Sequence, residues 1–95
     1  MSDLSVTLEH QRDGACLVTL RGEMDLTTVE DFVGSVFLVE APIEIDCQHL
    51  SFIAGAGLSA LARLAQFNVV TLLNESAMLR RLLDVCQMTD LFEHR

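Results

Sequence analysis

The residues whose types and spacing most suggest chemistry are 52–61, which read FIAGAGLSAL. A glycine-rich turn before a helix leaves backbone N–H groups free, and such groups can bind a phosphate. The stretch has no lysine, does not follow the GxxxxGK[ST] spacing of a nucleotide-binding loop, and lies in an acidic chain. It therefore favours a tight turn that needs small residues where a strand meets a helix.

Histidine, cysteine and carboxylate residues offer little for a metal site or an active site. Cys47 and His49 are two positions apart, but a structural zinc site needs four clustered ligands, and His10 and His94 lie near the two ends. No Ser-His-Asp, Cys-His or paired-carboxylate arrangement has a credible spacing. We therefore expect no metal, no cofactor and no enzymatic activity.

Composition and charge narrow the classes of partner. The formal net charge is −8 with only six Lys and Arg residues, so a nucleic-acid backbone or an anionic membrane surface would be repelled. The apolar runs, such as residues 69–73, are too short to cross a bilayer, and the opening MSDLSVTLEH lacks the features of a secretion signal. We expect a single cytoplasmic domain, residues 1–95, with protein or neutral partners. Three cysteines in apolar segments predict small buried side chains: Cys16, Cys47 and Cys86.

Four strands must position the glycine-rich stretch. Residues 4–9 alternate apolar and polar, residues 12–14 form a turn, and residues 16–20 are nearly all apolar, which predicts a hairpin whose second strand is covered on both faces. Residues 43–47 and 69–73 predict the third and fourth strands.

Three helices alternate with the later strands. Thr27 and Glu30 have the spacing of a capping box and predict the start of the first helix. The second helix follows the glycine-rich stretch, and Asn68 predicts a left-handed end. The third starts near Glu75, and its apolar stripe consists of Leu79, Leu82, Leu83 and Cys86. The fold class is therefore α/β, a four-stranded mixed sheet with about three helices in the order ββαβαβα.

Three stretches together resemble the STAS domain of the anti-sigma factor antagonist family, over nearly the whole chain. Residues 22–25 (GEMD) resemble the family's turn before the first helix, and residues 45–53 resemble its third strand and exit. Gly57 and Leu58 match the Gly-Leu that follows its central motif, Asp-Ser-Ser-Gly. The resemblance implies the STAS fold.

The central motif itself is altered. Aligned without a gap, the motif's aspartate corresponds to Ala54, and the serine that partner kinases phosphorylate corresponds to Gly55. Glycine has no hydroxyl, so phosphorylation at the family position is excluded. Phosphate there would add about two negative charges beside the helix and break partner binding, so the surface of this chain should remain binding-competent.

The resemblance implies a non-enzymatic regulator that docks an anti-sigma factor or a related kinase-like switch protein. The residues expected to contact that partner are Asp25, Ala54, Gly55, Ala56, Gly57 and Leu58. The alternative is a resemblance to the small STAS subunits that bind the ATPase subunit of bacterial ABC-type phospholipid transporters. Those subunits also lack a phosphoserine cycle, although their loop usually keeps a threonine that this chain lacks.

Several side chains keep two interpretations. Asp25 is a partner contact by resemblance and a turn or capping residue on local grounds. Ser51 and Ser59 flank the loop as substitute phosphate acceptors, but backbone and capping roles are commoner for such serines. From periodicity we expect Phe52 and Leu61 in the core, and Leu58 beside the loop in an exposed docking patch.

Overall fold

The computed structural model describes residues 3–95, so the first two residues of the predicted domain and of its opening segment lie outside it. Its elements are β1 (Leu4–His10), β2 (Cys16–Met24), α1 (Val29–Val36), β3 (Ile43–Ile53), α2 (Gly55–Phe67), β4 (Val70–Leu73), α3 (Ala77–Val85), the 3-10 turn η1 (Thr89–Leu91) and β5 (Glu93–His94). The α/β class and the predicted order are confirmed. The count of four strands is wrong, because β5 adds a fifth.

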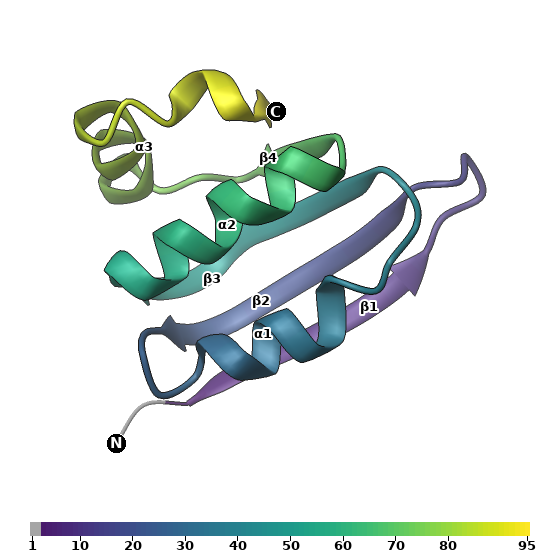
Figure 1. Ribbon diagram of the computed structural model, residues 1–95, viewed down its shortest axis with the longest axis horizontal. Helices are drawn as coiled ribbons and strands as arrows, with labels where there is room; N and C mark the ends of the chain where they lie inside the picture. Colours follow the sequence, from purple (N-terminus) through teal and green to yellow (C-terminus); the bar gives the residue numbers. More distant parts are fainter. Residues whose placement is uncertain (1–2) are drawn as a thin grey trace.

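The sheet has the strand order β1-β2-β3-β4-β5 (Figure 1). β1 and β2 form the predicted antiparallel hairpin, and every other neighbouring pair is parallel. β5 escapes prediction because it has only two residues, Glu93 and His94, and two polar residues carry no hydrophobic periodicity.

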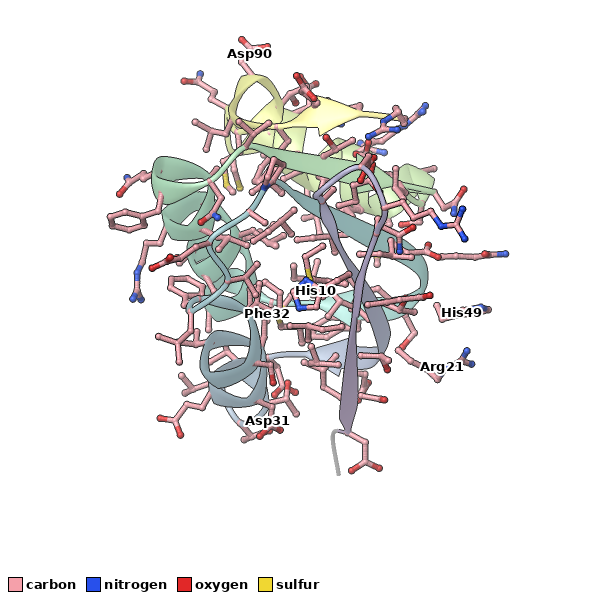
Figure 2. The ribbon with its side chains drawn as sticks, turned by 90° about the vertical axis from the view of Figure 1, so that its right-hand side faces the viewer. His10, Arg21, Asp31, Phe32, His49 and Asp90 are labelled. Carbon is pink, nitrogen blue, oxygen red and sulfur yellow. The ribbon has the colours of Figure 1, made fainter. Side chains whose placement is uncertain are left out.

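Helices cover one face of the sheet. α1 and α2 lie side by side across it in Figure 1, and the alternate residues Cys16, Val18 and Leu20 of β2 are buried beneath them. Leu17 and Thr19, which point to the other face, are only half-buried. The expectation that β2 is covered on both faces is therefore wrong. Figure 2 shows the same arrangement: Phe32 points from α1 towards the sheet, whereas Arg21 and His49 project on the side away from the helices.

Gly22 marks an irregular place in β2. Its φ is +110°, and a Cβ there would collide with the carbonyl oxygen of Asp3. The register between β2 and β3 also shifts between Thr19 and Arg21 and again between Gly22 and Glu23. These bulges change which β3 residues point inward. Cys47, Leu50 and Ile53 are buried, three positions apart, whereas a regular strand would bury every second residue.

The ends of α2 and α3 differ from the predictions. Asn68 has extended backbone, so the predicted left-handed end is wrong; its side-chain amide instead donates to the carbonyls of Val39 and Ala41 and holds the loop before β3. α3 starts after Ser76, whose hydroxyl accepts from the Leu79 N–H. Cys86 lies past its last turn and is exposed, so its predicted burial is wrong.

The rest of the apolar pattern agrees with the structure. Leu79 and Leu83 of α3 are buried, as are Cys16 and Cys47, and all four belong to one hydrophobic core. Among residues 3–95, no helix is long and apolar enough to cross a membrane.

Candidate functional site

The carboxyl ends of β2 and β3 bring the candidate site together. Met24 pairs with Ile53 across these strands, and the Met24 carbonyl accepts from the Ala54 N–H at 2.9 Å. Asp25 and Ala54, 29 positions apart in sequence, therefore follow directly from two adjacent strand ends. This edge of the sheet is where parallel strands commonly present functional residues.

Asp25 holds the turn that starts α1. Its Oδ1 accepts hydrogen bonds from the N–H of Thr27 at 2.9 Å and of Thr28 at 3.2 Å, and from the Thr27 hydroxyl at 2.7 Å. The Thr28 hydroxyl accepts in return from the Asp25 N–H at 2.9 Å and donates to the Glu23 carbonyl at 2.8 Å. The reciprocal bonds are those of a capping box.

The predicted capping box of Thr27 and Glu30 is therefore wrong. The turn begins two residues earlier, with Asp25 and Thr28 as the bonded pair, and no side chain caps the first residue of α1 itself. The capping role of Asp25 accordingly has direct geometric support, whereas its contact with a partner stays a prediction.

The glycine-rich stretch is the first turn of α2 and not a separate loop. Ala54 precedes the helix with extended backbone, Gly55 is its first residue, and no side chain caps it. Gly55 and Gly57 do not have positive φ, so the strand meets the helix without a left-handed turn, and the expected need for small residues rests on packing instead. The N–H groups of a first helical turn have no partner within the helix.

The two glycines of this turn have different surroundings. A Cβ on Gly57 would lie 2.7 Å from Cγ1 of Ile53 and 2.9 Å from Cγ of Met24, so packing requires the small residue. A Cβ on Gly55 would meet no atom within 4 Å, and Gly55 is exposed. Position 55 thus has open space for a side chain but carries none.

The exposure of the neighbouring apolar residues corrects two expectations. Leu58 is only 8% exposed and belongs to the core, so its predicted place in an exposed patch is wrong. Phe52 is 44% exposed, so its predicted burial is also wrong, whereas Leu61 is buried as expected. Leu26, 79% exposed next to Asp25, is an apolar surface residue that periodicity did not identify, because it lies in a turn.

A groove between α1 and α2 continues from this turn. It has a volume of about 620 Å³, and its lining includes Glu30, Val33, Ala56, Ser59 and Arg63. Of these residues, only Ala56 was predicted as a partner contact; Ser59 and Glu30 were considered for other roles. The others could have been found from helical spacing, since Glu30 and Val33 lie three apart on α1, and Ala56, Ser59 and Arg63 lie three and four apart on α2.

The two flanking serines lie in different settings. The Ser51 hydroxyl donates to the Gly22 carbonyl at 3.0 Å and joins the ends of β2 and β3. Ser59 is exposed and is the fifth residue of α2, beyond the first turn, so it does not cap the helix. Its side chain faces the groove.

Cys47 and His49 do not come together as ligands. Cys47 is buried with its Sγ 3.7 Å from the Ile45 carbonyl, and burial raises the pKa of its thiol to about 12. His49 is exposed on the side away from the helices (Figure 2). Within residues 3–95, no group of three His, Cys, Asp or Glu residues is arranged to hold a metal ion.

Comparison with known proteins gives both a family and a fold. The family model of the STAS domain matches residues 8–95. The structure resembles an anti-sigma factor antagonist from Mycobacterium paratuberculosis with a TM-score of 0.80 and 22% identity, covering 97% of this chain and 85% of that chain. It also resembles the anti-sigma factor antagonist SpoIIAA in its unphosphorylated form (TM-score 0.75, 21% identity, 96% of this chain and 88% of that chain).

A third similar structure is the Bacillus cell fate determinant SpoIIAA in its phosphorylated form, with a TM-score of 0.67 and 20% identity over 96% of this chain and 91% of that chain. The comparison with curated proteins finds no match. At these identities the structural likeness shows a shared fold.

Proposed function

The chain belongs to the STAS domain family, and from this premise we propose that it is a protein-binding regulator of the anti-sigma factor antagonist type. It docks an anti-sigma factor, or a related kinase-like switch protein, in the bacterial cytoplasm. It does so by binding alone, without catalysis and without a phosphorylation cycle at position 55. The whole-chain likeness to anti-sigma factor antagonists supports this proposal.

The observation that carries the proposal is the surface around Gly55. The residue is exposed at the start of α2, a side chain would have free space there, and the preceding Ala54 contributes only a methyl group. No hydroxyl is therefore available for phosphoryl transfer at either residue. A partner that binds this surface meets the same uncharged chemistry at all times.

We assign the docking surface to the turn that starts α2, the exposed Leu26 and Phe52 beside it, and the α1–α2 groove that continues from Ala56. Leu26 adjoins Asp25, and Glu30 lines the groove, so apolar and acidic side chains both contribute to this surface. Exposed apolar side chains surrounded by polar ones are typical of protein interaction sites. Leu58 and Gly57 support this surface from beneath, since both are buried.

The experiment that tests the proposal is an affinity pull-down from a native lysate, identified by mass spectrometry. Gly55→Asp adds a charge within the proposed surface. Leu38→Asp is the matched control: it adds the same charge at Leu38, which is 86% exposed and follows the end of α1 that is farther along the chain from Asp25. Capture of an ATPase-fold anti-sigma factor by the unaltered chain and by Leu38→Asp, but not by Gly55→Asp, is the expected result.

The same pull-down distinguishes the alternative function. Recovery of a transporter ATPase subunit with its permease would replace the proposal by a transporter STAS subunit. Equal recovery of the anti-sigma factor by Gly55→Asp would keep the partner but move the interface away from the start of α2.

A further inference from the structure

The last residues of the chain close the outer edge of the sheet. β5 pairs with β4 through Thr71 opposite Glu93 and Leu72 opposite His94. The Arg95 N–H donates to the Leu72 carbonyl at 2.9 Å, and the Asn74 N–H donates to the Arg95 carbonyl at 3.2 Å. A two-residue strand has too few ladder bonds to stay paired on its own, so side chains must hold it.

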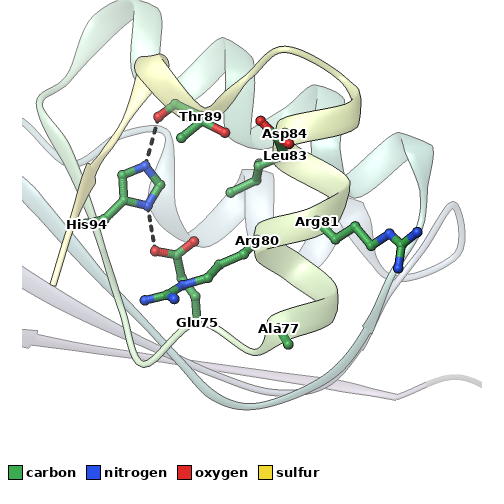
Figure 3. A pocket seen from close by; sticks show the side chains of 8 residues that line it. All are labelled: Glu75, Ala77, Arg80, Arg81, Leu83, Asp84, Thr89 and His94. Atoms are coloured by element: carbon green, nitrogen blue, oxygen red, sulfur yellow. Dashed lines mark hydrogen bonds and ion pairs between the residues drawn. The ribbon is translucent and has the colours of Figure 1, made fainter.

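His94 makes the side-chain contacts that can do this. Its Nδ1 lies 2.5 Å from Oε1 of Glu75, in the connection between β4 and α3, and its Nε2 lies 2.8 Å from the Thr89 carbonyl of η1 (Figure 3). Both of these oxygens are acceptors. A neutral imidazole has only one N–H, so both bonds form together only when the ring is an imidazolium.

The Glu75 side chain is only 2% exposed, so water cannot solvate its negative charge, and the His94 imidazolium balances that charge. Its second oxygen, Oε2, is buried without a partner among the described residues, and so is the hydroxyl oxygen of Thr89. Breaking a buried ion pair by neutralising one member leaves an uncompensated charge, which is strongly unfavourable. The His94–Glu75 contact is therefore expected to be formed when His94 is charged and broken when it is neutral.

Other charged groups near the pair come mainly from α3. Arg80, Arg81 and Asp84 line the same pocket of about 640 Å³ as Glu75 and His94 (Figure 3). The residues on either side of His94 also contact the sheet, since the Glu93 carboxylate accepts from the Thr71 hydroxyl of β4 and the Arg95 guanidinium pairs with Glu44 of β3; neither contact involves the His94–Glu75 pair.

The balance of these groups favours the imidazolium. The pKa of His94 is raised from 6.5, first by its hydrogen bond to the Thr89 carbonyl and then by that to Glu75, while the positive charge of Arg80 opposes the shift. A histidine with a raised pKa contributes its stabilisation fully below about pH 6.5 and loses it as the pH rises through the raised value.

We propose that His94 and Glu75 form a pH-sensitive latch, which holds η1 and β5 against β4 and α3 while His94 is protonated and releases them when it is not. Release leaves the outer edge of β4 unpaired and lets Phe92, which is buried in the core next to His94, swing out with the strand. The pairings among β1, β2, β3 and β4 include no residue of β5.

The latch is tested by nuclear magnetic resonance on the full chain. The ring signals of His94 are titrated with pH. In parallel, hydrogen-exchange protection factors, corrected for the intrinsic pH dependence of exchange, are measured for the amides of Asn74 and Arg95. Glu75→Gln and His94→Gln remove the two members of the pair, and His49→Gln is the matched control.

The latch predicts that His94 titrates above the ordinary histidine pKa of 6.5, and that Glu75→Gln lowers this value. Protection of the Arg95 amide should fall about tenfold for each unit by which the pKa is raised in the closed state, with no such fall in His94→Gln. Titration of His94 at or below the ordinary histidine pKa of 6.5, or the same pH response of Arg95 in wild type and His94→Gln, would overturn it. The wild-type titration decides the matter even if a variant does not fold.

Discussion

Gly55 and Gly57 lie two positions apart in one helical turn and differ in what they tolerate. At Gly57 a methyl group would press on Ile53 and Met24, so Gly57→Ala should lower the free energy of unfolding by about 1–3 kcal/mol. Gly55→Ala, with open space, should change it by no more than about 0.5 kcal/mol. Urea denaturation followed by circular dichroism measures both, since the chain has no Trp or Tyr. Equal decreases in the free energy of unfolding for the two variants would contradict the close packing of Ile53 and Met24 against Gly57.

The open space at position 55 leads to a second expectation. Gly55→Ser should fold as wild type and present a hydroxyl at the position that the sequence resemblance aligns with the family's phosphorylated serine. Incubation with the bound partner and ATP, followed by mass spectrometry, should then detect a phosphate on the variant and none at this position in wild type. Failure of a partner with demonstrated kinase activity to modify the variant would count against a lost switch.

The three cysteines should differ in reactivity. With a pKa of about 12, Cys47 is a thiolate in only about one molecule in ten thousand at pH 8, and the thiolate is the reactive form. Cys86 is exposed, so iodoacetamide should modify it first and give one adduct per folded chain by intact mass. Unfolding in urea should then release the other two; rapid modification of Cys47 in the folded chain would contradict its burial.

At the scale of elements, Asp25 joins the end of β2 to the start of α1. Asp25→Ala removes the acceptor for the Thr27 and Thr28 amides and should cost about 0.5–2 kcal/mol of stability. Glu30→Ala should cost much less, because Glu30 makes no capping bond. Thermal unfolding of the two variants distinguishes them, and a larger loss for Glu30→Ala would restore the capping box expected from the sequence.

Asp25→Asn separates the two roles of this residue. The amide oxygen still accepts from the backbone, so the start of α1 should persist while the negative charge is removed. A fall in partner affinity with little change in stability would indicate a direct contact. A fold and an affinity both close to wild type would leave Asp25 as a capping residue only.

Sequence patterns predicted the helices and strands in which apolar residues recur at a regular spacing over several turns or residue pairs. The hairpin of β1 and β2 and the buried Leu79 and Leu83 of α3 follow from alternation and helical spacing. The side-chain directions near the site could not be predicted, because the bulges between β2 and β3 break the alternation. Phe52 therefore points outward and Leu50 inward. The capping box was misplaced because Asp25 and Thr27 are both good candidates for a helix start.

At the scale of the whole molecule, the site and the latch lie on different parts of one sheet. The candidate docking surface is at the carboxyl ends of β2 and β3, and the latch closes the β4 edge (Figures 1 and 3). The family resemblance in the sequence indicated the first region through Asp25 and residues 54–58. The second was invisible in sequence, because Glu75, Thr89 and His94 follow no motif and come together only when β5 folds back onto β4.

We propose that the surface at Gly55 binds the partner protein and that phosphorylation at position 55 cannot prevent this binding. The most direct test is calorimetric titration of the captured anti-sigma factor into the unaltered chain, before and after incubation with ATP. Gly55→Asp and Leu38→Asp are titrated in parallel.

If partner binding at Gly55 has no phosphorylation switch, the affinity of the unaltered chain is the same before and after incubation with ATP. The affinity of Gly55→Asp is lower by about tenfold or more, and that of Leu38→Asp is unchanged. An affinity that falls after incubation with ATP, together with a phosphate on Ser59 or another residue, would contradict the proposal. So would an affinity of Gly55→Asp equal to that of the unaltered chain.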